Sequence, residues 1–277
     1  MTKLFKGILI AIICGVLVLV YSLYIEPKIL VNHEYDLNKE KSGESQNIKV
    51  VQLSDIHISE NYTEKQLEKM VEKVNKLEPD IITFTGDLFD NYSKYGPVKE
   101  TVEALGKLKA KYGKYSVWGN RDYGGGASRQ YENIMRDSGF TLLKNEGVNI
   151  HIENGKKIFI GGLDDALLGN LDVDNALRKM KKDSDYKIML MHEPDKADVL
   201  KDSELNLILA GHSHGGQVKI PLLKRTKTAL AKKYISGFYT INEKTQLKLY
   251  VNTGIGTTRI PVRFMVPPEI SIFNIAI

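Results

Sequence analysis

The stretch Gly211-His212-Ser213-His214-Gly215-Gly216-Gln217 follows directly on the apolar run Leu205-Asn206-Leu207-Ile208-Leu209-Ala210. Such a short apolar run predicts a buried strand. Two histidines two residues apart at a strand end can aim both rings at one point once the backbone turns, and the neighbouring glycines permit that turn. Neutral imidazole is a common protein ligand of transition metals. The pattern therefore predicts a buried strand that ends in a metal-binding turn.

Four other apolar runs end in side chains of the same kind. Each is a predicted strand followed at its carboxyl end by Asp, Asn or His, which is where open α/β sheets place their ligand sites. A single one of these residues could equally be a hydrogen-bonded core group or a turn residue. Five such strand ends together favour one shared site. The four further segments are residues 50–57, 80–87, 115–122 and 187–194.

The order Asp-x-His, Gly-Asp, Gly-Asn-x-Asp, His and Gly-His-x-His resembles that of the calcineurin-like metallophosphoesterases. Within that family, residues 211–221, 234–239 and 252–258 resemble the YkuE-like branch of membrane-associated bacterial enzymes. The likeness covers residues 47–277. It implies an α/β fold with mixed sheets, arranged as a four-layer αββα sandwich and preceded by an N-terminal transmembrane helix.

The resemblance also implies two divalent metal ions, which would be Mn, Fe or Zn. It implies hydrolysis of a phosphoester or pyrophosphate bond by attack of a hydroxide that bridges the two ions. Asp164 and Asp165 are expected to support the site or the fold without binding metal. The resemblance implies that Asp55, His57 and His214 bind one ion and that Asn120, His192 and His212 bind the other. It implies that Asp87 is shared by both ions.

One position departs from the family pattern, in which His follows the Gly-Asn pair. This chain has Arg121 there. A guanidinium keeps its proton at working pH, so it can stabilise a phosphate or a leaving group but cannot serve as a general acid. In one reading Arg121 faces the metals and Asp122 supports the site from behind. In the other, a salt bridge to Asp122 takes Arg121 out of the site.

The segment 219–242 is basic and partly apolar, with six Lys or Arg and no acidic residue. A solvated loop would explain it, and so would a flap that meets anionic lipid headgroups. The expected substrate is a phosphorylated small molecule or lipid. The basic segment and the N-terminal helix together favour a phosphorylated lipid or envelope precursor, such as the substrate of a UDP-2,3-diacylglucosamine hydrolase. Two alternatives stay open: a nucleotide or cyclic-nucleotide phosphodiesterase, and a non-catalytic metal-binding membrane receptor. The net charge of +5 is mild, and no nucleic-acid partner is expected.

Three regions are expected: an anchor at 1–30, a polar linker at 31–46 and the catalytic domain at 47–277. Residues 8–25 carry no charge, and as a helix they would span about 27 Å, close to one hydrocarbon core. No small-residue cleavage site follows, and Ile13 before Cys14 does not fit a lipoprotein signal. Lys3 and Lys6 favour a cytoplasmic N-terminus, which predicts a single-pass membrane protein with an extracytoplasmic domain.

Helical patterns alternate with the early strands, and antiparallel strands are expected late in the chain. A capping box at 63–66 predicts the start of the first helix of the domain. Asn154-Gly155 predicts a hairpin between two strands. The remaining expected helices are residues 97–113, 128–139 and 172–182.

Overall fold

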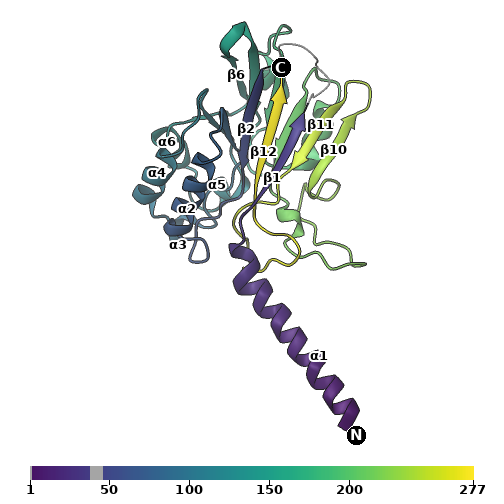
Figure 1. Ribbon diagram of the computed structural model, residues 1–277. Coiled ribbons are helices and arrows are strands. Elements are labelled where there is room, and N and C mark those ends of the chain that lie inside the picture. The colour runs from purple at the N-terminus through teal and green to yellow at the C-terminus, as the bar shows by residue number, and fades with distance from the viewer. Residues whose placement is uncertain (1, 38–45) are drawn as a thin grey trace.

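Two six-stranded sheets form the centre of the computed structural model, which describes residues 2–37 and 46–277 (Figure 1). In order across the first sheet, the strands are β1 (Val31–Leu37), β12 (Glu269–Ala276), β2 (Asn47–Leu53), β3 (Ile81–Phe84), β4 (Lys114–Ser116) and β5 (Phe140–Leu142). Across the second sheet they are β10 (Gly237–Asn242), β11 (Leu247–Val251), β9 (Leu207–Ala210), β8 (Tyr186–Leu190), β7 (Lys157–Gly162) and β6 (Glu146–His151).

The layers follow from the alternation of apolar side chains along the strands. Val51 faces the helices outside the first sheet, whereas its neighbour Val50 packs between the two sheets. Short helical elements cover the outer face of the second sheet. The four-layer αββα arrangement is thus confirmed. The outer elements are α2 (Glu64–Asn75), α4 (Val98–Gly106) and α6 (Tyr131–Asp137) on one side, and α7 (Val173–Leu177) with the 3₁₀ helix η4 (Pro194–Leu200) on the other.

Strand directions place the carboxyl ends of the central strands at the end of the domain next to the N-terminal helix. β1 leaves that helix and runs parallel to β12, and β12 is antiparallel to β2. Strand β2 therefore returns toward the helix, and β3, β4 and β5 run parallel to it. Figure 1 shows the arrowhead of β12 beside the C-terminus, at the end of the domain far from α1 (Thr2–Val20).

The N-terminal helix is continuous with the domain and not separated from it by a linker. After α1 come a π-helical turn, η1 (Tyr21–Ile25), and a 3₁₀ turn, η2 (Glu26–Lys28). Among the described residues, Lys3–Lys28 is the one span long and apolar enough to cross a membrane, and 6% of its apolar window is buried. Glu26, in contrast, is 2% exposed, and its carboxylate accepts the backbone N–H groups of Met265 and Val266.

The polar linker expected at residues 31–46 is the prediction from which the structure differs most. Residues 31–37 form β1, which pairs with β12 over seven positions, so this part of the expected linker belongs to the sheet. Residues 38–45 of that linker lie outside the described residues. The helix expected to reach residue 113 ends at Gly106, and farther along the backbone N–H of Tyr112 donates to the carbonyl of Asp80, just before β3.

The other local expectations differ mainly in length. The capping box is present at Thr63 and Gln66 and starts α2. The hairpin between β6 and β7 is confirmed, and it turns through a 3₁₀ segment, η3 (Glu153–Gly155). The helices α6 and α7 are shorter than the ranges expected for them. The remaining helical elements are α3 (Tyr92–Tyr95), α5 (Asn120–Gly124) and η5 (His214–Gly216).

Candidate metal centre

The fold brings all seven expected ligands to one place. They lie in the loops that follow five parallel strands, where the carboxyl ends of the two sheets meet. Six of the seven are buried. The loops follow β2 (Asp55 and His57), β3 (Asp87), β4 (Asn120), β8 (His192) and β9 (His212 and His214).

The first group consists of Asp55, His57 and His214, whose ligand atoms all lie within 4.8 Å of one another. The Nε2 atoms of the two histidines are 3.0 Å apart. Asp55 Oδ1 lies 3.7 Å from His57 Nε2 and 3.4 Å from His214 Nε2. The other oxygen, Oδ2, accepts a hydrogen bond from the backbone N–H of His212. That bond fixes the carboxylate so that Oδ1 points into the group.

Asp87 joins the first group to the second. Its Oδ2 lies 3.5 Å from His57 Nε2 and 3.4 Å from His192 Nε2, between the two sets of expected ligands. Its Oδ1 accepts the backbone N–H of Arg121 at 2.7 Å. This is the position expected of a carboxylate that two ions share.

Backbone carbonyls orient the histidines of the second group. His192 Nδ1 lies 2.7 Å from the Thr85 carbonyl, and His212 Nε2 lies 2.7 Å from the Ala229 carbonyl. Each of these nitrogens carries a proton when it donates to the carbonyl, so the opposite ring nitrogen offers a lone pair. The two rings lie 4.9 Å apart between centroids. The arrangement brings the two histidine rings to neighbouring positions in one compact group.

The backbone around the site is strained in a consistent way. A positive φ is uncommon for residues other than glycine and costs on the order of 1 kcal/mol or more. It persists where the surrounding contacts hold it, and such positions cluster at functional sites. Five of the seven expected ligands adopt it: Asp55 (48°), His57 (47°), Asp87 (60°), His212 (67°) and His214 (49°).

Two glycines let the loops approach one another closely. A Cβ on Gly211 would lie 2.0 Å from Ser54 Oγ and 2.3 Å from Asp55 Oδ2. A Cβ on Gly119 would lie 2.3 Å from Asp87 Oδ1. Side chains at either position would therefore displace a carboxylate of the site.

Metal ions fit the unpaired atoms of this centre. Asp55 Oδ1, His192 Nε2 and Asn120 Oδ1 are buried and have no hydrogen-bond partner. An unpaired buried polar atom costs about 1–3 kcal/mol, so three of them in one cluster call for a bound group. Mixed carboxylate, amide and imidazole donors suit Mn, Fe or Zn better than an all-oxygen calcium site. The role of each residue as a ligand stays a prediction.

Asp122 supports the centre from behind and does not pair with Arg121. Its buried carboxylate accepts the backbone N–H groups of Gly119, Asp87 and Leu88 at 2.9 Å each, which ties the loops after β3 and β4 together. Burial, with Asp87 nearby, raises the pKa of Asp122 to about 7. The reading in which Asp122 draws Arg121 away from the site is wrong, because these donors occupy the carboxylate.

Arg121 lies instead at the mouth of the centre. Its Nη2 donates to Thr258 Oγ1 at 3.2 Å, and its Nε lies 4.0 Å from Asp90 Oδ1. The same Asp90 oxygen lies 3.6 Å from His57 Nδ1. Arg121 is therefore one residue removed from the imidazole of an expected ligand, His57.

Sequence reasoning missed three residues of this region. Asp90 and Thr258 hold Arg121, and Glu193 is buried beside His192 with a carboxylate that accepts the backbone N–H of Ala166. Glu193 belongs to a compact group with His192 and His212. Only its position next to a histidine at a strand end could have drawn attention to it.

Asp164 and Asp165 serve the fold next to the site, as expected. The Asp164 carboxylate accepts the Tyr123 hydroxyl and the backbone N–H of Asn170, and Asp165 Oδ1 accepts the backbone N–H of Leu167. The two carboxylates hold the loop after β7, and neither belongs to the compact groups of possible metal ligands in the described chain.

A pocket of about 490 Å³ opens at His212 and His214. Its walls come from the turn after β9, from residues 226–229 of the basic segment and from residues in the range 258–262. Val218 pairs with Phe264, and the backbone N–H of Lys219 donates to the Phe264 carbonyl, so the turn after β9 is joined to the chain just beyond residue 262. Ile260 is an exposed apolar side chain of the lining, and Leu222, Leu223 and Met265 are exposed outside it.

Comparison with known proteins gives a consistent family. The model of the calcineurin-like phosphoesterases matches residues 48–216. The uncharacterized metallophosphoesterase YkuE of Bacillus subtilis (strain 168) is 36% identical over 257 residues, which are 92% of this chain and 88% of the relative. A transmembrane protein with metallophosphoesterase domain from Danio rerio is 29% identical, and the match covers 96% of this chain and 62% of that protein.

Among solved structures, the protein TT1561 from Thermus thermophilus aligns over 76% of this chain and 91% of its own chain. The alignment has a TM-score of 0.46 and 12% identity.

Proposed function

The chain belongs to the calcineurin-like phosphoesterases, a family of metal-dependent phosphoesterases, and we propose that it hydrolyses a phosphorylated lipid or envelope precursor at the membrane surface. The observation that carries this proposal is the position of the metal centre. The centre lies at the end of the domain from which the apolar N-terminal helix leaves.

In the proposed site, Asp55, His57 and His214 would hold one ion, Asn120, His192 and His212 would hold the other, and Asp87 would be shared by both. Two bound divalent ions supply charge that activates water and stabilises the phosphoryl oxygens. The protein adds a second source of positive charge at Arg121, which can bind a phosphate oxygen or a leaving group. Because Arg121 keeps its proton, it does not protonate the leaving oxygen.

The surroundings of the pocket support a lipid substrate over a soluble nucleotide. The lining of the pocket at His212 and His214 includes Lys227, Arg259 and the exposed apolar side chain of Ile260. The loop at 263–266 contacts the membrane helix and the turn after it directly. The backbone N–H of Arg263 donates to the Ser22 carbonyl at 2.9 Å, and the Glu26 carboxylate accepts the backbone N–H groups of Met265 and Val266. A substrate held in a bilayer would meet the pocket without leaving the membrane.

The domain is further proposed to face outward, with its helix as a retained single-pass anchor. Lys3 and Lys6 precede the apolar span, which favours a cytoplasmic N-terminus. Protease added to intact cells should then remove the domain. Full protection of the domain in intact cells would contradict this orientation.

The substrate proposal is tested with the full chain in nonionic detergent and added Mn²⁺. The panel comprises a lipid pyrophosphate, a lipid phosphomonoester, a nucleoside diphosphate sugar that bears acyl chains, and the matching water-soluble compounds without acyl chains. The expected result is a kcat/KM for the lipid compounds that exceeds that for their soluble counterparts.

Two variants make this test specific. Asp87→Asn should abolish turnover of every substrate, whereas Asp174→Asn on α7, an exposed residue far from the ligands in sequence, should change nothing. Equal kcat/KM for lipid and soluble compounds would refute the lipid assignment while leaving the phosphoesterase activity intact. No turnover of any compound by metal-loaded protein would favour the receptor alternative.

A further inference from the structure

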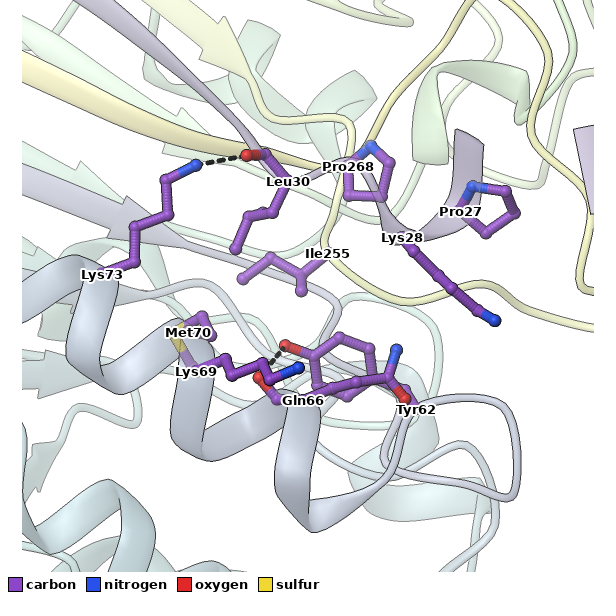
Figure 2. A pocket seen from close by; sticks show the side chains of 10 residues that line it. All are labelled: Pro27, Lys28, Leu30, Tyr62, Gln66, Lys69, Met70, Lys73, Ile255 and Pro268. Carbon is purple, nitrogen blue, oxygen red and sulfur yellow. Dashed lines mark hydrogen bonds between the residues drawn. The ribbon is translucent and has the colours of Figure 1, made fainter. Parts of the chain in front are cut away.

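A second pocket of about 490 Å³ lies between the end of the membrane helix and α2, outside the metal centre. Figure 2 shows its two sides: α2 contributes Lys69, Met70 and Lys73, and the chain that leaves the anchor contributes Lys28 and Leu30. None of the seven expected metal ligands lines it. The catalytic proposal therefore does not use this pocket.

The lining combines positive charge with an apolar floor. Three of the ten residues that line the pocket are lysines, and no Asp or Glu is among the ten (Figure 2). Between the lysines lie apolar side chains, among them Leu30, Ile255 and Pro268. Lys73 Nζ is held in place by donating to the Leu30 carbonyl, as the dashed line in Figure 2 marks. Such a lining accepts a ligand that is anionic at one end and apolar at the other.

The pocket stands at the level where a membrane surface would lie. Lys28, on its rim, is the last residue of the apolar span. A neighbouring pocket of about 340 Å³ shares Pro27, Lys28, Tyr62 and Gln66 with it and extends to Leu23 and Tyr24 of the anchor. Tyr24 and Ile25 are 63% and 48% exposed. The lining of this neighbouring pocket includes the polar residues Glu60, Asn61 and Thr257 as well as Leu23, Tyr24 and Pro27. A partly apolar path thus leads from the lysines along the outer surface of the membrane helix.

We propose that this pocket binds the headgroup of an anionic glycerophospholipid from the surrounding leaflet. The phosphate lies among Lys28, Lys69 and Lys73, and the acyl chains follow the anchor past Leu23 and Tyr24. The lysines would recognise a phosphate group with one negative charge, and a free phosphate carries the same group. The apolar side chains beside the pocket, Leu23 and Tyr24 of the anchor, favour a lipid. The bound lipid would fill the space between anchor and domain.

The test uses native mass spectrometry of the full chain in nonionic detergent doped with phosphatidylglycerol or phosphatidylcholine. Lys28→Gln/Lys69→Gln removes two exposed lysines from the rim and leaves the Lys73 hydrogen bond intact. Each lysine near an anionic lipid contributes about fivefold to affinity, so the double variant should bind phosphatidylglycerol about 30-fold more weakly. Binding of phosphatidylcholine should stay weak in both proteins.

A matched control is Lys65→Gln/Lys76→Gln, which changes the net charge equally at exposed positions on α2 and its carboxyl cap, outside the pocket. It should bind phosphatidylglycerol like the unaltered protein. Equal retention of phosphatidylglycerol by all three proteins would overturn the proposal. Unfolding temperatures measured in lipid-free detergent show whether either double variant is misfolded. If the pocket double variant is misfolded, the single variant Lys69→Gln takes its place in the binding measurement.

Two further measurements separate this site from other phosphate sites. Chelation of metal with EDTA should leave phosphatidylglycerol binding unchanged, and its loss would assign the lipid to the metal centre. Inorganic phosphate and glycerol phosphate should displace the lipid only at far higher concentration. If they bind as tightly as phosphatidylglycerol, the pocket is a site for a free anion and the lipid assignment fails.

Discussion

Replacement of Arg263 by Met should destabilise the domain and loosen the metal centre together. Arg263 is fully buried, and its guanidinium donates to four carbonyls, those of Thr253, Gly254, Gly256 and Val266. Burial lowers its pKa to about 10, so it is still charged at pH 7. A methionine of similar length would leave these carbonyls without a donor.

The size of the effect follows from that bonding. A hydrogen bond to a charged group contributes about 1.5–3 kcal/mol, but Nη2 serves three of the four carbonyls with two hydrogens, so the bonds are not additive. Removal of one partner from a buried charged network costs about 3–5 kcal/mol. We expect a loss of about that size, which is a third or more of the free energy of unfolding of many domains.

The same change should weaken metal binding. The N–H of Gly256 donates to the Asp55 carbonyl at 2.7 Å, so the loop that Arg263 holds also holds the backbone of an expected ligand. Each 1.4 kcal/mol that reaches the metal centre lowers metal affinity about tenfold. Elemental analysis after dialysis should therefore find less metal in Arg263→Met than in the unaltered protein.

The assay is urea unfolding of the full chain in nonionic detergent, followed by fluorescence of the single tryptophan, Trp118, which is buried in the domain. Arg263→Lys keeps the charge but loses the planar guanidinium, so its stability should fall between those of the unaltered protein and Arg263→Met. The control is Arg136→Met on the surface of α6, where we expect a change within about 0.5 kcal/mol. Equal unfolding curves for Arg263→Met and Arg136→Met would refute this reasoning.

Three further predictions concern the anchor and the site. A fragment that starts at residue 31 should unfold at lower urea than one that starts at residue 21, because only the longer one keeps Glu26; coincident curves would show that the Glu26 contacts add nothing. Asp87→Asn should retain less metal than any other single ligand change, since Asp87 lies between both groups; two tightly held ions and full turnover would rule out a shared ligand. Arg121→His should speed hydrolysis of alkyl phosphoesters more than that of activated aryl esters, by up to about 10²–10⁴-fold where proton donation limits the rate, and Arg121→Ala should slow both. Unchanged rates in both variants would place Arg121 outside the reaction.

The site was more predictable than its surroundings, for a physical reason. Its expected ligands follow apolar strands in short motifs, and parallel strands bring their carboxyl ends together whatever the details of packing. The partners of Arg121 were not predictable, because Asp90 and Thr258 are remote from it in sequence and come close only in the folded chain. The buried role of Glu26 was hidden in the same way, since its partners lie near the other end of the chain.

The error at residues 31–37 has a related cause. This strand has four exposed and three half-buried residues, so its sequence lacks the apolar run by which β2 and β9 are identified. Its partner, β12, lies between it and β2, and only the register of that pair shows that the segment belongs to the sheet. The length of the helix that begins after Pro97 was overestimated because Gly113, with a φ of 108°, marks a later turn, whereas α4 ends at Gly106.

The pairing of β1 with β12 also bears on the order in which the protein can be completed during synthesis. The first strand of the domain pairs with the last, from Val31 opposite Glu269 to Leu37 opposite Ile275, so it stays unpaired on this side until β12 has been made. At ribosomal speeds of about 5–20 residues per second, the delay between their syntheses is on the order of 10–50 s. The strands of the second sheet are all translated within that interval. The first sheet, which connects the anchor to the loops of the metal centre, can therefore close only after β12 has been translated.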